Sequence, residues 1–552
     1  MIQRISMRRG VPGFTLALMI LAADASLVQA QQPPPGVDAG ALQNRTNRLR
    51  RDLENRVAPG ASDDAGAVTG PARAAAPLVP GGGPTFVLKR VEFNESYFFK
   101  PQELAAIAAP FVGRKLDFAG IQAIVNAVNA RYAERGIVTA SASLPEQDLD
   151  GGVLRIELVE GRVGKVTMEG ASTSADYIRG RARLQPGEVV DVPALGARMA
   201  AQNRIGEARV RTALQPGTDF GQTDVTLSVT EPKSDLLDVF VDNLGSPTTG
   251  RFQRGMLFQH YGLLGLDDRF KFYGVNSEGN LSGNLSYTFG ITPTGGRLGL
   301  SYSASRIKII DGAFEDLNVT GGSQAGGINF VQPLFSDSEW LVLLNVGATL
   351  THSTTDQDGV PFTDNLTFKP MIGATLNYYA PNLAVSFSPS YSFGTTDIRV
   401  TDSSDQAHFF NGTMSVTAVL PQEVVFQGFG AWQVASKPLV TGDQLFQIGG
   451  ATTVRGYGGN TVAGGSGYYA NFELHKSFTG DVGTFDFFTF LDHGAVYSTS
   501  PKKVSLTGIG TGMSYSFDNR LTLELTLGFP VGDHVPDSPS YTLFARLIGR
   551  VF

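Results

Sequence analysis

The chain has 552 residues, including 66 glycines and no cysteine, and 17% of its residues are charged against about 25% in an average globular protein. The lack of cysteine excludes a disulfide framework, a thiolate metal site and a cysteine nucleophile. A formal net charge of −7 without a long basic run argues against a nucleic-acid partner, and a hydrophobic content of 42% argues against a bundle of many membrane-spanning helices.

Residues 1–30 have the pattern of a secretory signal peptide. An apolar stretch, Phe14–Ala23, is followed by Val28-Gln29-Ala30, which offers small residues at the two positions that a signal peptidase reads. The basic residues before this stretch are Arg4, Arg8 and Arg9. Ten apolar residues are too few for a transmembrane helix, which needs about 20. We therefore expect an exported chain that begins near Gln31.

Residues 31–57 predict an amphipathic helix, and residues 58–83 predict a flexible linker. The apolar residues of the helix form one thin line, at Leu42, Leu49, Leu53 and Val57. The rest of its surface is rich in arginine, so it has too little apolar surface to belong to a core, and a solvated tail fits these residues equally well. The linker is made of Ala, Gly, Pro and Val in short steps.

Residues 84–160 and 161–232 predict two copies of a β-α-α-β-β module. The first copy is expected to contain a strand at Phe86–Phe93, helices at Pro101–Ala109 and around Ile121–Tyr132, and strands at Val138–Leu144 and Val153–Val159. The second is expected to contain a strand at Val163–Met168, helices near Ser174–Ala182 and Pro193–Asn203, and strands near Ala208–Leu214 and Val225–Val229. Gly136 follows the long helix of the first copy, where a left-handed cap is needed.

Residues 233–552 show no convincing amphipathic helix and alternate with a period of two. The clearest stretches are Asn284–Ile291, Arg297–Ala304, Asn365–Tyr378, Leu383–Phe393 and Leu521–Leu527. Their polar faces carry mostly Ser, Thr, Asn and Gly rather than the dense Lys, Glu and Arg of a soluble sandwich. We count sixteen strand-like runs, which predict a transmembrane β-barrel of 16 antiparallel strands. The terminal Phe552 is typical of bacterial outer-membrane barrels, whereas Arg550 is less typical.

The candidate functional residues lie in one loop and one strand of this barrel. The glycine-rich loop between runs eleven and twelve contains Val454-Arg455-Gly456-Tyr457. Run thirteen contains Phe490, Asp492 and Gly494 on one face, with Leu491 on the other. If the face of Leu491 meets lipid, Asp492 points into the lumen, where it can anchor an arginine from a loop that folds inward. We therefore predict a pair between Arg455 and Asp492.

At these two motifs the chain resembles the outer-membrane assembly-factor superfamily of barrels. The two modules look like polypeptide-transport-associated (POTRA) domains. Together with the N-terminal helix, the linker and the 16-stranded barrel, they resemble the transporters of two-partner secretion, of the haemolysin-secretion type. The resemblance covers essentially the whole mature chain. An assembly or insertion factor of the same superfamily is the alternative, but it would normally carry more modules.

The resemblance implies a pore that carries one large exoprotein, unfolded, from the periplasm to the cell surface. The modules would recognise the N-terminal secretion domain of this partner, often by strand addition, and the first helix would plug the lumen. The barrel would lie in outer-membrane lipid after insertion by the barrel-assembly machinery, with the modules in the periplasm. No cofactor is expected, and the chain has no Gly-x-x-x-x-Gly-Lys-Ser/Thr motif for a nucleotide.

Two other classes of function fit the sequence less well. An enzyme is disfavoured because the histidines are isolated in sequence and no H-E-x-x-H or G-x-S-x-G motif is present. These histidines are His260, His352, His408, His475, His493 and His534. A passive porin is disfavoured because a diffusion pore needs neither two modules nor an arginine loop.

Overall fold

The computed structural model describes residues 34–57, 68–70, 82–149, 151–170, 173–459, 462–499, 501–518, 520–531 and 538–552. The expected signal peptide lies outside the described residues, as do most residues of the expected linker. The chain divides into two units, Met1–Pro34 and Pro35–Phe552, and all described residues but Pro34 belong to the second. No helix among the described residues is long and apolar enough to cross a membrane.

The first module packs two helices against a small sheet with strand order β3-β6-β5. Its elements are β2 (Phe86–Val87), β3 (Arg90–Phe93), α2 (Pro101–Ala108), β4 (Lys115–Leu116), α3 (Phe118–Glu134), β5 (Ala140–Ser143) and β6 (Val153–Glu160). Alternate residues of β6 are apolar and buried, and they contact the buried face of α3 in one core. Gly136 follows α3 with a φ of 70°, the left-handed conformation expected there.

The single strand expected at Phe86–Phe93 is wrong in detail, because the chain changes partners midway. β2 pairs with β4, whereas β3 pairs in parallel with β6. Between them, the Leu88 amide donates to the Arg114 carbonyl (3.0 Å) and the Lys89 amide donates to the Gly152 carbonyl (2.8 Å). The stretch therefore contributes to two sheets, and its alternating side chains alone do not show where it changes from one partner strand to the other.

The second module repeats the β-α-α-β-β order, and one strand from the preceding segment joins its sheet. Its elements are β7 (Arg162–Glu169), α4 (Ala175–Ala182), α5 (Val192–Ile205), β8 (Arg209–Pro216) and β9 (Gln222–Thr230). The additional strand is β1 (Val68–Thr69), which comes from the segment expected to be a linker and pairs in parallel with β8. The sheet order is therefore β1-β8-β9-β7.

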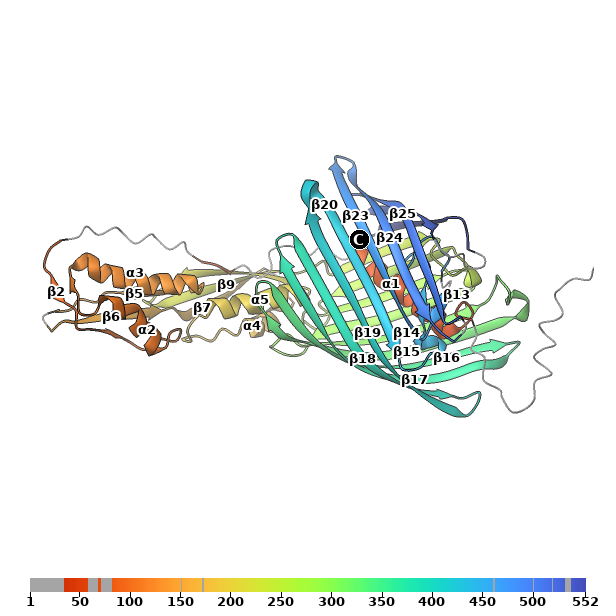
Figure 1. Cartoon of the computed structure of the whole chain (residues 1–552), viewed down its shortest axis with the longest axis horizontal. Coiled ribbons are helices and arrows are strands. Elements are labelled where there is room, and N and C mark those ends of the chain that lie inside the picture. The colour runs from red at the N-terminus through yellow and green to blue at the C-terminus, as the bar shows by residue number, and fades with distance from the viewer. Residues whose placement is uncertain are drawn as a thin grey trace, which may run out of the picture. The chain divides into compact units, whose positions relative to one another are not determined.

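The rest of the chain forms a closed antiparallel barrel of 16 strands, as the period-two pattern predicts (Figure 1). The strands are β10 (Asp235–Asp242), β11 (Gln253–Tyr261), β12 (Arg269–Asn276), β13 (Asn280–Gly290), β14 (Arg297–Lys308), β15 (Val319–Ser336), β16 (Trp340–Gln357), β17 (Val360–Ala380), β18 (Leu383–Ile398), β19 (Ser403–Leu420), β20 (Val424–Ala435), β23 (Ser466–Gly480), β24 (Gly483–Tyr497), β25 (Lys503–Phe517), β26 (Leu521–Pro530) and β27 (Thr542–Arg550). β27 pairs with β10 and closes the barrel.

The two faces of the barrel wall differ in chemistry. Large apolar side chains such as Leu285 and Phe387 are exposed on the outside, while polar neighbours such as Ser282 and Asn284 are buried on the inside. Such an inverted distribution is expected when the outer face meets lipid and the inner face meets water or polar protein groups. The barrel thus has the polarity of a membrane-spanning structure.

Two segments fill part of the lumen. The helix α1 (Ala39–Val57) lies among the barrel strands (Figure 1), and its first amide, Ala39 N–H, donates to Thr355 Oγ1 of β16 (3.2 Å). The connection between β20 and β23 also folds inward and forms the short strands β21 (Phe446–Ile448) and β22 (Val462–Gly464). The two segments meet where Gln447 Nε2 donates to the Ala41 carbonyl (3.2 Å).

Candidate functional site in the barrel lumen

The loop arginine and the wall aspartate lie in direct contact. β23 and β24 are the twelfth and thirteenth barrel strands, so the loop and the strand lie where the sequence places them. Arg455 donates from Nε to Asp492 Oδ2 (2.7 Å) and from Nη2 to Asp492 Oδ1 (2.7 Å). Its backbone amide also donates to Oδ2 (2.9 Å), and Asp492 is fully buried. The contact is a bidentate, charge-assisted pair, which is the strong form of this interaction.

Neighbouring groups extend the pair into a network. Arg455 Nη1 lies 2.5 Å from Glu473 Oε1 on β23, and the guanidinium lies over the ring of Phe490, 3.7 Å from its centroid. Asn471 Nδ2 donates to Asp492 Oδ1 (2.8 Å), which occupies the remaining capacity of that oxygen. One cation therefore faces two carboxylates and an aromatic ring, and this arrangement fixes the side chain at the inner wall.

Sequence reasoning did not identify His475 as part of this network. His475 lies on β23 with Nε2 2.8 Å from Glu473 Oε2 and Nδ1 2.7 Å from Asp486 Oδ2 of β24. Asp486 lies on the next strand of the same hairpin and becomes a neighbour through the register of that strand pair, which the sequence does not specify. By contrast, His493 points to the other face of β24 and contacts Tyr468 and Thr507, as its alternation with Asp492 predicts.

The other motif residues support the loop by packing. Val454 and Tyr457 are buried in one apolar cluster with Ile448 and Leu506. A Cβ on Gly494 would lie 3.2 Å from Val454 Cγ2 and 2.9 Å from the Tyr468 carbonyl oxygen, so a side chain there would press on the loop. The structure thus brings all seven residues of the two motifs to one side of the lumen.

Two further glycines, which sequence reasoning missed, make room for the loop tip. A Cβ on Gly508 would lie 1.7 Å from the Arg455 carbonyl oxygen, and one on Gly528 would lie 2.7 Å from the Gly456 amide nitrogen. Gly456 itself has a φ of 103°, which favours glycine. In a chain with 66 glycines no local signal singles out these two, because their role follows from the close approach of a distant backbone.

The helix α1 is fixed in the lumen by ion pairs and by two apolar clusters, one of which joins Leu42 to Ile307 and Val319 of the barrel. Arg546 Nη1 of β27 lies 3.0 Å from Asp52, and Arg56 Nη1 lies 3.1 Å from Glu524 of β26. Lys271 Nζ of β12 lies 3.1 Å from Glu54. The thin apolar line of the helix packs against the barrel wall. Leu53 of this line is buried in a cluster with Phe240, Tyr273, Leu257, Val275 and Ile548.

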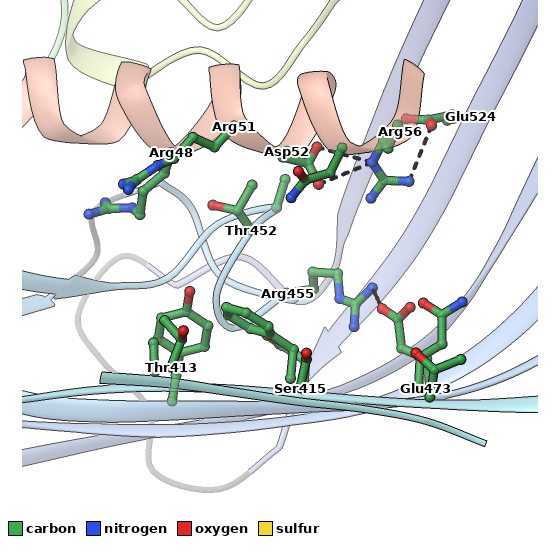
Figure 2. Close-up of a pocket in the computed structure, with 18 of the residues that line it drawn as sticks. Arg48, Arg51, Asp52, Arg56, Thr413, Ser415, Thr452, Arg455, Glu473 and Glu524 are labelled. Atoms are coloured by element: carbon green, nitrogen blue, oxygen red, sulfur yellow. Dashed lines mark hydrogen bonds and ion pairs between the residues drawn. The ribbon is translucent and has the colours of Figure 1, made fainter. Parts of the chain in front are cut away.

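The arginine network and α1 border the same cavity, which has a volume of about 1990 Å³. Figure 2 shows Arg48, Arg51, Asp52 and Arg56 of the helix on one side of it, and Arg455 with Glu473 on the other. Thr413 and Ser415 of β19 complete the wall in this view. Charged and hydroxyl groups make up much of the lining of the cavity, beside aromatic residues such as Phe429 and Trp432, and this suits a wet passage.

The unusual residue near the C-terminus also faces the lumen. Arg550 Nε donates to Asp238 Oδ1 of β10 (2.9 Å), and Asp238 is buried. An arginine two places before the terminal phenylalanine is compatible with a lipid-facing end strand because its side chain points inward and is paired. The terminal residue, Phe552, is still hydrogen-bonded to β10, since its carbonyl accepts from the Leu237 amide (3.3 Å).

The fold and the lumen define an outer-membrane β-barrel of the transporter class, preceded by periplasmic α/β modules. Residues 86–161 match the POTRA domain of ShlB type, and residues 221–515 match the family described as haemolysin secretion/activation protein ShlB/FhaC/HecB. The second match spans more than half of the chain. The chain belongs to this family, and it is an outer-membrane protein with its POTRA modules in the periplasm.

Relatives and solved structures agree with this assignment. Outer membrane transporter CdiB of Dickeya dadantii (strain 3937) is 24% identical over 499 residues, which cover 85% of this chain and 87% of that protein. Heme/hemopexin transporter protein HuxB of Haemophilus influenzae (strain 86-028NP) is 21% identical over 474 residues, which cover 81% of this chain and 83% of that protein.

Among solved structures, CdiB from Escherichia coli superposes with a TM-score of 0.74 at 21% identity, covering 94% of this chain and 99% of that one. CdiB from Acinetobacter baumannii superposes with a TM-score of 0.69 at 18% identity, covering 92% and 98%. At these identities the structural likeness establishes the fold.

Proposed function

We propose that this protein is the outer-membrane pore of a two-partner secretion system, which carries one exoprotein, unfolded, from the periplasm to the cell surface. The observation that carries the proposal is the combination of two periplasmic modules with a barrel whose lumen contains its own helix and an inward-folded loop. A diffusion pore needs no modules and gains nothing from a filled lumen. The relatives whose names describe them as transporters support this proposed function.

The modules are the proposed receiving site for the N-terminal secretion domain of the exoprotein. Each module contains an open sheet, and an extended chain can add to the edge of such a sheet by backbone hydrogen bonds. No enzymatic step is needed for this function, and no cofactor is assigned to it. Insertion of the barrel into outer-membrane lipid is assigned to the cell's barrel-assembly machinery.

The lumenal residues have two proposed roles. The helix α1 acts as a plug, held by ion pairs that an incoming chain can replace. The motif Val454-Arg455-Gly456-Tyr457 holds the inward loop against its wall partners Phe490, Asp492 and Gly494, and sets the position of the loop in the passage. The bidentate geometry of Arg455 with Asp492 supports this second role.

The test is co-expression with a candidate exoprotein partner, followed by assay of its release at the cell surface. Release should depend on the full chain, and an exchange of residues 84–232 for those of a related transporter should change which exoprotein is bound. Release of the exoprotein without the chain would contradict the proposal. A fall in many outer-membrane barrels when the chain is depleted would instead favour an assembly factor.

A further inference from the structure

The chain's own linker occupies an edge of the second module. Val68 and Thr69 of β1 are the register partners of Thr212 and Ala213 of β8, and Thr69 Oγ1 donates to the Thr212 carbonyl (3.2 Å). β1 is therefore an added strand on a sheet whose other members all come from residues 162–230. An unpaired edge is the part of a sheet that accepts a foreign strand, so β1 blocks the position at which one would add.

A side chain occupies the adjacent part of the same edge. Asn203 of α5 accepts from the Val210 amide (2.7 Å) and donates to the Val210 carbonyl (2.9 Å). Because the backbone groups of alternate strand residues point to the same side, Val210 and Thr212 face the same edge of β8. The first module has the same device, since Asn129 of α3 binds the Ala142 amide (2.8 Å) and carbonyl (3.3 Å) on β5. Among the described residues, the second module alone has an added strand beside its asparagine on this edge.

The added strand is short enough to be exchanged. β1 covers two positions of β8, which has eight residues, and Thr69 is exposed. Gly66 and Pro71 flank the strand in sequence, and proline has no amide hydrogen with which to extend the pairing. A longer extended segment aligned along β8 would form more backbone hydrogen bonds than β1 does.

We infer that Val68–Gly70 is an autoinhibitory strand, which an extended segment of the exported protein displaces from β8. This inference rests on the proposed function and adds a regulatory step to it. Gly70 lies between the modules, because a Cβ there would be 3.1 Å from Val138 of the first module and 3.9 Å from Leu214 of the second. An occupant of this edge therefore contacts both modules.

Displacement of β1 also changes the tether of the plug. Ten residues, 58–67, separate the end of α1 from β1, and they span at most about 36 Å. When β1 leaves β8, the next described anchor is Gly82, whose amide donates to Asp117 (2.9 Å), so the tether lengthens to the 24 residues 58–81. Arrival of an extended chain at β8 thus lengthens the tether of α1.

The test uses the absence of cysteine in the full chain. In the double variant Thr69→Cys/Ala213→Cys, the two positions are register partners on neighbouring strands. Neighbouring strands lie about 4.7–4.9 Å apart, and a disulfide spans a Cα separation of about 4.4–6.8 Å. The matched control is Ala213→Cys/Thr226→Cys, which uses the same position on β8 but links it to β9. A third variant, Thr69→Pro, removes the amide hydrogen of residue 69 in β1.

Two readouts are measured, the frequency of wide openings in planar bilayers and the release of the co-expressed exoprotein. Oxidised Thr69→Cys/Ala213→Cys should lower both by about tenfold relative to its reduced form, the factor that corresponds to about 1.4 kcal/mol. Thr69→Pro should raise the opening frequency by a similar factor. The oxidised control should match its reduced form.

The two proposals fail separately. If deletion of residues 31–57 raises conductance while neither the cross-link nor Thr69→Pro alters openings or release, the autoinhibitory strand is refuted and the plug remains. If the cross-link and Thr69→Pro shift the opening frequency in opposite directions but no exoprotein is released by any form, the secretion function is refuted and the inhibitory contact remains.

Discussion

Removal of the Arg455 side chain tests whether the loop is held by its charge network. The change Arg455→Ala leaves the fully buried Asp492 and the nearby Glu473 without their shared cation. Breaking a buried pair from one side typically costs about 3–5 kcal/mol, because the remaining charge is uncompensated. The network is too local to hold the barrel together, so this cost falls on docking of the loop.

The amide of Gly456 is a suitable reporter, because it donates to Thr542 Oγ1 (3.1 Å) and touches neither mutated side chain. A loss of about 3 kcal/mol corresponds to a rise in its hydrogen-exchange rate of about a hundredfold. Asp492→Ala should cause a smaller rise, because Arg455 keeps Glu473. Release of the exoprotein should fall strongly in both variants, while heat-modifiable folding of the barrel stays intact.

The double variant Arg455→Ala/Asp492→Ala should be no worse than Arg455→Ala, since it also removes the buried carboxylate that Arg455→Ala leaves without its cation. Arg455→Lys should rescue poorly, because lysine lacks the planar fork that bonds both carboxylate oxygens. Arg520→Ala is the matched control: its side chain lines the same cavity but is 80% exposed. Additive losses in the double variant, or full release by Arg455→Ala, would refute the reasoning.

Three further changes have defined outcomes. Deletion of residues 31–57 should raise ion conductance in planar bilayers without unfolding the barrel, and unchanged conductance would contradict the plug. Arg546→Gln should increase the frequency of spontaneous openings, because Asp52 of α1 loses its partner on β27, and openings as rare as in the unaltered chain would contradict this. Leu154→Ala, in the core of the first module, should destabilise that module by about 2–5 kcal/mol, measured by hydrogen exchange of α3; unchanged protection would contradict the assigned core.

The sequence predicts the barrel well because a wall between lipid and a polar lumen imposes its period of two on every strand. Asn284, Leu285 and their neighbours alternate between polar and apolar side chains, so the pattern can be read from the sequence of a single strand. The proximity of Arg455 and Asp492 was predictable because alternation places Asp492 on the inner face and glycines allow the loop to fold back.

Features that depend on distant backbone were not predictable. The strand β1 has two residues in a segment of Ala, Gly, Pro and Val, and only the edge of β8 makes it a strand. The break after Val87 reflects a change of partner strand, and His475 meets Asp486 only through the pairing of β23 with β24. Each of these depends on which segments meet, and side-chain period carries no information about that.

The contacts of Arg546 join two properties of the barrel that otherwise look separate. The seam at which the barrel closes pairs Asp238–Asp242 with Arg546–Arg550. Across this seam Arg546 Nε lies 3.3 Å from Asp242, and the same guanidinium holds Asp52 of α1 through Nη1. Occupancy of the lumen and closure of the seam are therefore linked equilibria: withdrawal of α1 takes a counter-ion from the arginine that bridges the seam, and by reciprocity a loosened seam weakens the hold on α1.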